Sequence, residues 1–156
     1  MATTHDATSL GAYVGQGAPY GTGVFTILKF HVDMSSLASD LAATIDGSSS
    51  DVVQLWDIPV GTQILGVLLN VTTKEGATAT MAVGDGDATA GYLAATSINS
   101  TGYTGTITSD AYAAATKVYA ATDTLDLLFA TDSDIDTAVF DLYVYALMNP
   151  AVYTIS

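Results

Sequence analysis

Two aspartate-rich stretches come closest to the residue types and spacing of a metal site. One is VGDGDATAGYL at residues 83–93, and the other is DSDID at residues 132–136. An EF-hand calcium loop places acids at its first, third and fifth positions, glycine at the sixth and glutamate at the twelfth. DSDID provides the three acids, but Thr137 takes the glycine position and Tyr143 takes the glutamate position. We therefore interpret this stretch as a solvated turn and expect neither a metal ion nor a cofactor.

The stretch at residues 83–93 has three candidate interpretations: a calcium loop, a phosphate-binding loop or a turn between two strands. An EF-hand that starts at Asp85 fails, because threonine takes its third and its last ligand position. Glycine and aspartate are both favoured in turns. We therefore interpret the stretch as an acidic hairpin connection. In it, Gly84 and Gly86 allow the turn, the aspartates are solvated, and Tyr92 re-enters the sheet.

Catalytic side chains are scarce. The sequence has no cysteine and two histidines. His31 lies near a predicted strand end with Asp33 two residues away, but no GxSxG nucleophile elbow accompanies them. Most of the aspartates fall in predicted turns, whereas a glycosidase holds its two carboxylates on either side of the scissile bond. We therefore expect that the protein is not an enzyme.

The chain is strongly negative. Sixteen acidic residues, nearly all of them aspartate, face three lysines and no arginine, which gives a formal net charge of −13. Nucleic acids and anionic membranes repel such a surface, because binding to phosphates depends on lysine and arginine. No apolar run approaches the roughly 18 residues that a membrane-spanning helix needs. We therefore expect no nucleic-acid partner and no membrane association.

From Val24 onward, apolar and polar residues alternate with the period of two that is typical of half-buried strands. Residues 34–45 are compatible with a short helix. Strands are predicted at residues 24–32, 52–59, 62–73, 78–86, 92–98, 104–108, 117–121, 125–130 and 137–148. This pattern predicts an all-β protein built as an antiparallel β-sandwich, with a jelly roll as the natural topology. We expect an extended N-terminal arm at residues 1–23, a single sandwich domain at residues 24–150 and a C-terminal tail at residues 151–156.

The predicted last strand has two different faces. One is aliphatic and aromatic, as a core requires, while the other carries Tyr143 and Tyr145, whose rings are apolar and whose hydroxyls are polar. Such a face is typical of a surface that contacts another subunit. The glycine-rich arm has enough freedom to lie along a neighbour and to become ordered on docking. We therefore predict that the contact residues are Leu10, Tyr13, Pro19, Tyr20, Tyr143 and Tyr145.

A longer stretch, LWDIPVGTQILGVLLNVTTKEGATATMAVGDGDATAGYL at residues 55–93, resembles a group of small virion proteins of tailed phages, particularly of marine and cyanobacterial phages. The matching elements are Ile58-Pro59, Gly61-Thr62, Gly66, Val71-Thr72-Thr73, Glu75-Gly76 and the run from Val83 to Leu93. The stretch GYTGTITSDAYAAATKVYAATDTLDLLFATDSDIDTAVFDLYVYALM, at residues 102–148, is also similar to that group. Residues 1–23 lie outside the resemblance.

The resemblance implies a jelly-roll or related β-sandwich virion protein, typically a head decoration (cement) protein that works as an oligomer, often a trimer. Its partners would be the major capsid protein and further copies of itself. Its role on the capsid surface would be to bridge capsid subunits, so that the shell resists the pressure of the packaged DNA. An alternative is a carbohydrate- or receptor-binding β-sandwich module of a tail, tail fibre or head fibre, which would use exposed aromatic residues beside acidic loops.

Overall fold

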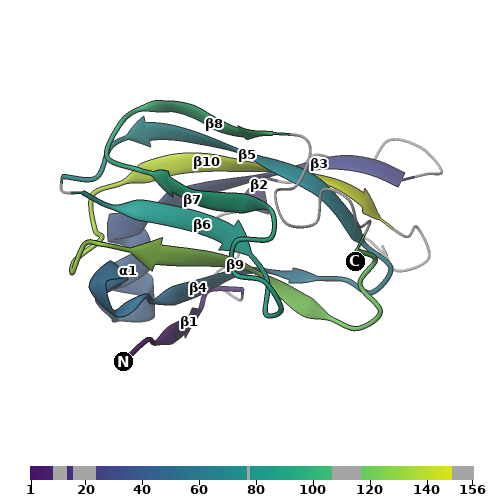
Figure 1. Ribbon diagram of the computed structural model, residues 1–156, viewed down its shortest axis with the longest axis horizontal. Coiled ribbons are helices and arrows are strands. Elements are labelled where there is room, and N and C mark those ends of the chain that lie inside the picture. Colours follow the sequence, from purple (N-terminus) through teal and green to yellow (C-terminus); the bar gives the residue numbers. More distant parts are fainter. Residues whose placement is uncertain (9–13, 16–23, 77, 107–116, 149–156) are drawn as a thin grey trace.

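The protein is represented by a computed structural model that describes residues 1–8, 14–15, 24–76, 78–106 and 117–148. Two five-stranded sheets pack face to face as a sandwich (Figure 1). In the first, the β4–β9 sheet, the order is β1 (Thr4–Asp6), β4 (Val52–Ile58), β9 (Asp123–Ala130), β6 (Thr80–Gly84) and β7 (Leu93–Ser97). In the second, the β3–β10 sheet, the order is β2 (Val14–Gly15), β3 (Val24–Asp33), β10 (Val139–Met148), β5 (Gln63–Thr73) and β8 (Gly102–Thr106). The pairs are antiparallel except for β1 with β4, so the predicted antiparallel sandwich is confirmed.

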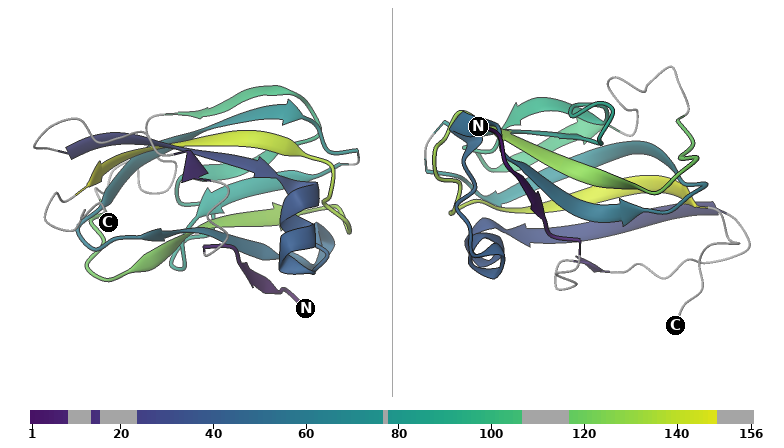
Figure 2. Two further views of the ribbon diagram at one scale, coloured as in Figure 1. Left: turned by 180° about the vertical axis from the view of Figure 1, so that it is seen from behind. Right: turned by 90° about the horizontal axis from the view of Figure 1, so that it is seen from below.

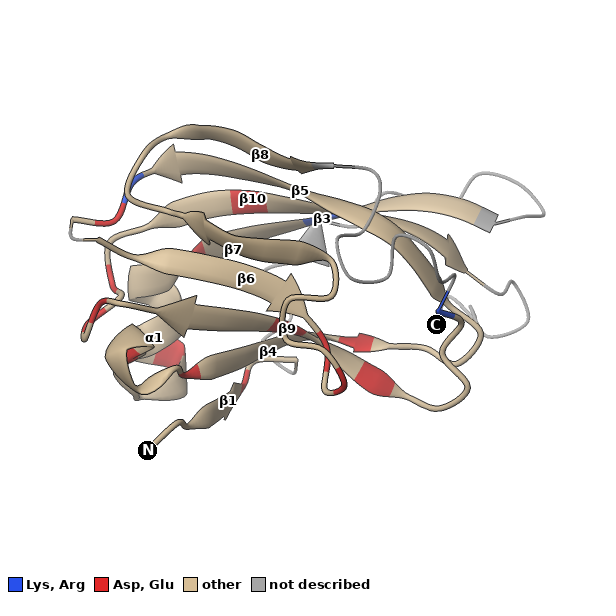
Figure 3. Ribbon diagram, viewed as in Figure 1, with Lys and Arg blue, Asp and Glu red and all other residues tan. Residues whose placement is uncertain are grey.

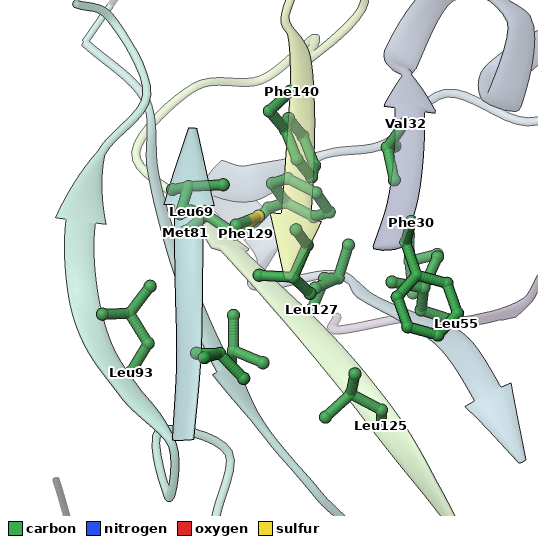
Figure 4. Packing of buried hydrophobic residues seen from close by; sticks show 14 of the residues in the cluster. Phe30, Val32, Leu55, Leu69, Met81, Leu93, Leu125, Leu127, Phe129 and Phe140 are labelled. Atoms are coloured by element: carbon green, nitrogen blue, oxygen red, sulfur yellow. The ribbon is translucent and has the colours of Figure 1, made fainter. Parts of the chain in front are cut away.

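The core lies between the two sheets and follows from the alternation of side chains. Phe30, Phe129 and Phe140 are fully buried and belong to one apolar cluster. Figure 4 shows side chains of both sheets projecting into this cluster. The predicted inward face of the last strand is confirmed, because these residues are 0% exposed: Ala138, Phe140, Leu142, Val144 and Ala146. Each large apolar side chain that is removed from water contributes about 1.5–3 kcal/mol to this packing.

The N-terminal segment contributes a strand to each sheet. β1 pairs with β4, and β2 pairs with β3 at an edge of the other sheet (Figure 2). The Asp51 carboxylate fixes β1, because it accepts a hydrogen bond from the backbone N–H of Thr3 (2.8 Å) and lies 3.0 Å from His5 Nε2. Within residues 1–23, the parts that the structure describes are thus paired with the sandwich. The division into arm, domain and tail stays a prediction, since residues 9–13, 16–23 and 151–156 lie outside the described residues.

The predicted short helix is present as α1 (Met34–Leu41). The Asp33 carboxylate caps it by accepting hydrogen bonds from two backbone N–H groups of the first turn, at 3.0 and 3.2 Å. Ala42 ends it with a left-handed φ of 50°. The short 3-10 turn η1 (Gly47–Ser49) follows. Over the described ranges, no helix has the length and apolar character needed to cross a membrane.

The predicted strands agree with the structure to within two residues at each described end, except that residues 117–121 do not form a strand. Residues 117–121 were expected to form a strand, but Val118 makes only an isolated bridge with Gln63. The backbone of Tyr119 bonds instead to the β4–β5 connection, at the carbonyl of Thr62 (2.9 Å) and the N–H of Gly61 (2.7 Å), which takes the place of a strand partner. The strand predicted at residues 104–108 starts two residues earlier, as β8, and residues 107 and 108 lie outside the described part of the chain.

Glu75 joins two loops at one end of the sandwich. Its side chain is buried, and Oε2 accepts hydrogen bonds from the backbone N–H groups of Thr137 and Ala138, both at 3.0 Å. Oε1 accepts from the N–H of Gly76 at 2.8 Å. A buried carboxylate is stable only where such donors replace water. Glu75 therefore holds the β5–β6 connection against the start of β10.

Replacing Glu75 with alanine should lower the free energy of unfolding by about 2–4 kcal/mol, because the buried N–H of Ala138 and the part-buried N–H of Thr137 lose their acceptor. Chemical denaturation monitored by the fluorescence of Trp56, the single tryptophan, measures the change. Lys74→Ala is the matched control: Lys74 is the exposed neighbour, so its loss should change stability by no more than about 0.5 kcal/mol. Equal effects of the two substitutions would contradict the role given to Glu75.

Candidate interaction surface

The outer face of the β3–β10 sheet exposes a group of large apolar side chains. Residues that alternate with the core residues point outward, and the strand register sets Ile27 beside Tyr145 and Lys29 beside Tyr143. Phe25 is 54% exposed and Ile27 is 44% exposed, while both tyrosines are partly exposed. We call Phe25, Ile27, Tyr143 and Tyr145 the aromatic face.

The side chains of the aromatic face support one another. The rings of Phe25 and Tyr145 stack with their centres 6.3 Å apart and their planes at 27°. Lys29 Nζ lies 5.7 Å from the centre of the Tyr143 ring, within the range of a cation–π interaction. Because these rings already have partners within the sheet, less side-chain entropy is lost when another molecule covers them.

An ion network borders the aromatic face. Asp141 Oδ2 lies 2.9 Å from Lys29 Nζ, and Asp141 Oδ1 lies 2.7 Å from His31 Nδ1. Burial alone would raise the pKa of Asp141, but the hydrogen bonds with Lys29 and His31 hold that pKa below its usual value. The hydrogen bond with Asp141 in turn raises the pKa of Lys29. The negative charge on this face is therefore compensated locally.

Two of the predicted contact residues, Tyr143 and Tyr145, lie together on the aromatic face, and their contact with a partner stays a prediction. Four more lie outside the described residues: Leu10, Tyr13, Pro19 and Tyr20. Phe25 and Ile27 belong to the same surface but are not among the predicted contacts. The alternation in residues 24–32 places both opposite the core, yet only the pairing of β3 with β10 brings them to the tyrosines.

The GDGD stretch contains a buried polar network. Asp85 is 0% exposed and accepts hydrogen bonds from the backbone N–H groups of Asp87 (3.1 Å) and Ala88 (2.9 Å). Its other oxygen accepts from Lys117 Nζ (2.7 Å) and from the hydroxyl of Tyr119 (2.6 Å). The hairpin connection between β6 and β7 is confirmed. The prediction that its aspartates are solvated is wrong for Asp85, because a segment 32 residues away covers it.

Three carboxylates converge on the Lys117 ammonium group. Lys117 Nζ lies 2.7 Å from Asp85, 2.9 Å from Asp87 and 3.7 Å from Asp123. The oxygens of the three carboxylates lie within 4.8 Å of one another, and the ammonium group supplies the positive charge that such a cluster requires. Burial raises the pKa of Tyr119, and its hydrogen bond to Asp85 adds to the increase. Tyr119 is thus kept as a neutral donor that closes the network.

Gly84 is required where the β6–β7 connection folds back over β6. A side chain at this position would overlap the backbone of Ala88 and Thr89. The requirement comes from this close approach and not from a left-handed φ. A side chain at Gly86 would meet only the Asp123 carboxylate, at 3.4 Å. Gly84 is therefore needed because it leaves room for the backbone of the turn, and not because it adopts a conformation that only glycine favours.

The DSDID stretch lies in the β9–β10 connection, at the other end of β9 from Asp123. Asp132 Oδ1 accepts a weak hydrogen bond from the N–H of Asp134 at 3.3 Å. Ile135 is fully buried, and its N–H donates to the carbonyl of Ile45 at 3.0 Å. The stretch is therefore anchored by its apolar residue, while Asp134 and Asp136 point to solvent.

Asp126 of β9 is a buried acid whose Oδ1 has no hydrogen-bond partner within the described residues. Burial raises its pKa, against the lowering effect of a hydrogen bond with Thr124. The negative charges of Asp123 and Asp85 raise the pKa further. Ionisation of Asp126 is therefore less favourable in the native protein than in the unfolded chain.

Asp126→Asn should raise the free energy of unfolding at neutral pH by about 1–2 kcal/mol. The folded-state pKa lies above the unfolded value, so ionisation of Asp126 destabilises the native protein, and this penalty disappears as the pH falls through the folded-state pKa. The gain should therefore shrink on acidification, as denaturation curves at a series of pH values would measure. Asp57→Asn, at an exposed site on β4, is the control and should give no gain. A gain that grows on acidification would contradict this account.

The sequence matches no known protein family and no curated protein. Solved structures match it in fold. A chain of the "Cyanophage Pam1 capsid asymmetric unit" is 18% identical with a TM-score of 0.59, over 90% of this chain and 96% of that chain. A chain of the "Capsid of Ralstonia phage GP4" is 14% identical with a TM-score of 0.59, over 92% of this chain and 95% of that chain. A chain of the "Acidic stable capsid structure of Helicobacter pylori bacteriophage KHP30" is 15% identical with a TM-score of 0.52, over 81% of this chain and 89% of that chain. The protein thus shares its fold, over most of its length, with a chain of each of these capsid structures.

Proposed function

We propose that the protein is a structural component of a phage virion, a decoration (cement) protein on the outer surface of the capsid. The observation that carries the proposal is the likeness in fold to a chain of the cyanophage capsid, which covers 90% of this chain and 96% of that chain. The two chains therefore correspond as whole proteins and not through one shared module. Chains of two further phage capsid structures have the same fold.

We infer that β3 to β10 form a jelly roll. In one sheet these strands stand in the order β3-β10-β5-β8, and in the other in the order β4-β9-β6-β7. The first of the eight therefore lies beside the last, and both halves of the chain contribute to each sheet. Two Greek keys in an eight-stranded double sheet produce this interleaving.

The aromatic face is the surface that we assign to the major capsid protein. It combines exposed apolar area with tyrosine hydroxyls, and aromatic residues are enriched where proteins bind one another. Burial of its apolar area provides about 25 cal/mol per Å². The compensated Lys29–Asp141 pair beside it avoids an unpaired charge at the contact.

The protein acts by bridging neighbouring capsid subunits and adding buried area to the shell. Each contact is modest, but a homo-oligomer such as a trimer, seated on a repeating lattice, multiplies the contacts through avidity. The net charge of −13 repels the packaged DNA, which is consistent with a position on the outside of the shell. No catalytic step belongs to this role.

Quantitative mass spectrometry of purified particles tests the proposal. We expect a copy number comparable with that of the major capsid protein. A few copies per particle would instead support the second candidate function, a receptor- or carbohydrate-binding module of a tail or fibre. Absence from the particles would contradict both.

Substitution on the aromatic face tests the assigned contact. Ile27→Asp should weaken binding to particles stripped of the protein at least about tenfold, because a buried contact would then hold an unpaired charge. Ser133→Asp, at an exposed loop position, adds the same charge away from this face and should bind normally. Thermal unfolding curves confirm that both variants are folded. Normal binding by Ile27→Asp would exclude the aromatic face as the contact.

A further inference from the structure

Each sheet of the sandwich has two neighbouring strands that carry no charged residue. β5, β6, β7 and β8 contain no charged residue, although the chain has 16 acids and three lysines. Residues 88–109, which include β7 and β8, form an unbroken run without charge. Figure 3 shows acids on α1, β1, β4, β9, β10 and the connecting loops, and none along β7 or β8. One long side of a strongly negative protein is thus neutral.

This neutral side is also an open sheet edge. β8 is the last strand of its sheet and pairs with β5 on one side, and in the described part of the chain no strand pairs with its other side. Gly102, Tyr103 and Thr104 are all exposed, and Tyr103 is 67% exposed. Proteins usually protect such edges with charged residues or proline, and β8 has neither. At the opposite edges, β1 and β2 are three and two residues long.

We infer that the neutral edge, formed by β7 and by Gly102–Gly105 of β8, is the surface through which copies of this chain associate. Two copies that each carry a charge of −13 repel one another, so their contact is favoured where neither presents an acid. A basic partner would instead be drawn to the acidic side around β4 and β9. The contact would combine burial of Tyr103 with hydrogen bonds to the backbone groups of β8 that have no strand partner within the described residues. The inference rests on the homo-oligomer of the proposed function and assigns its surface.

Sedimentation velocity of the purified full-length chain tests this inference without any capsid. The wild-type chain should associate, and more tightly as salt rises from about 0.03 to 0.3 M, because salt screens the repulsion between the negative copies. Thr104→Asp should raise the dissociation constant at least about tenfold, because it places like charges at the contact. Tyr103→Asn should weaken association too, while Tyr103→Phe should preserve it.

Two controls separate this contact from the others. Ser133→Asp adds the same charge at an exposed loop, and Ile27→Asp adds it on the aromatic face, so both should associate like the wild type. A monomeric wild-type chain, or loss of association in Ile27→Asp but not in folded Thr104→Asp, would overturn the inference. Absence of the protein from virions would refute the proposed function and leave the sedimentation result unchanged, so the two failures are distinguishable.

Discussion

Sixteen acidic residues share three lysines, and this shortage of cations shapes the structure. Lys29 neutralises Asp141 of β10, and Lys117 neutralises Asp85 and Asp87 of the β6–β7 connection. Glu75 relies instead on backbone N–H groups, and Asp51 combines backbone N–H groups with a contact to His5. Oriented peptide dipoles thus stand in for missing side-chain cations. Each of these acids also ties together segments that lie far apart in the chain, so charge compensation and tertiary structure are achieved by the same contacts.

The strands can be predicted from sequence where one face is core and the other solvent, because alternation is then unavoidable. β3 and β10 are of this kind, including the outward position of Tyr143 and Tyr145. Whether an acidic residue is buried or exposed cannot be predicted in this way. Asp85 lies in a sequence typical of a surface turn, and it is buried only because a distant segment folds over it. Residues 117–121 alternate like a strand, yet Tyr119 bonds to the β4–β5 turn, and the segment makes only an isolated bridge, between Val118 and Gln63, to a strand.

The aromatic face and the neutral edge are different surfaces of the sandwich, because β7 of the neutral edge belongs to the β4–β9 sheet. The face lies over β3 and β10, whereas the edge follows β8, with β5 between them. A face and an edge of one sheet point in different directions, so one molecule can contact a support and a neighbour at the same time. The two sets of side chains do not overlap, which allows either contact to change without loss of the other.

The first long strand, β3, depends on a strand that is synthesised much later, β10. β3 pairs with β10 along its whole length, with Val24 opposite Met148, so this sheet has no central strand until the segments between β3 and β10 have been translated. Pairings at such sequence separation form slowly. Until β10 arrives, β3 and β5 present apolar surface and unpaired edges to other nascent chains. The yield of folded protein in a cell therefore depends on whether the chain avoids aggregation before β10 is available, and not only on the stability of the folded sandwich.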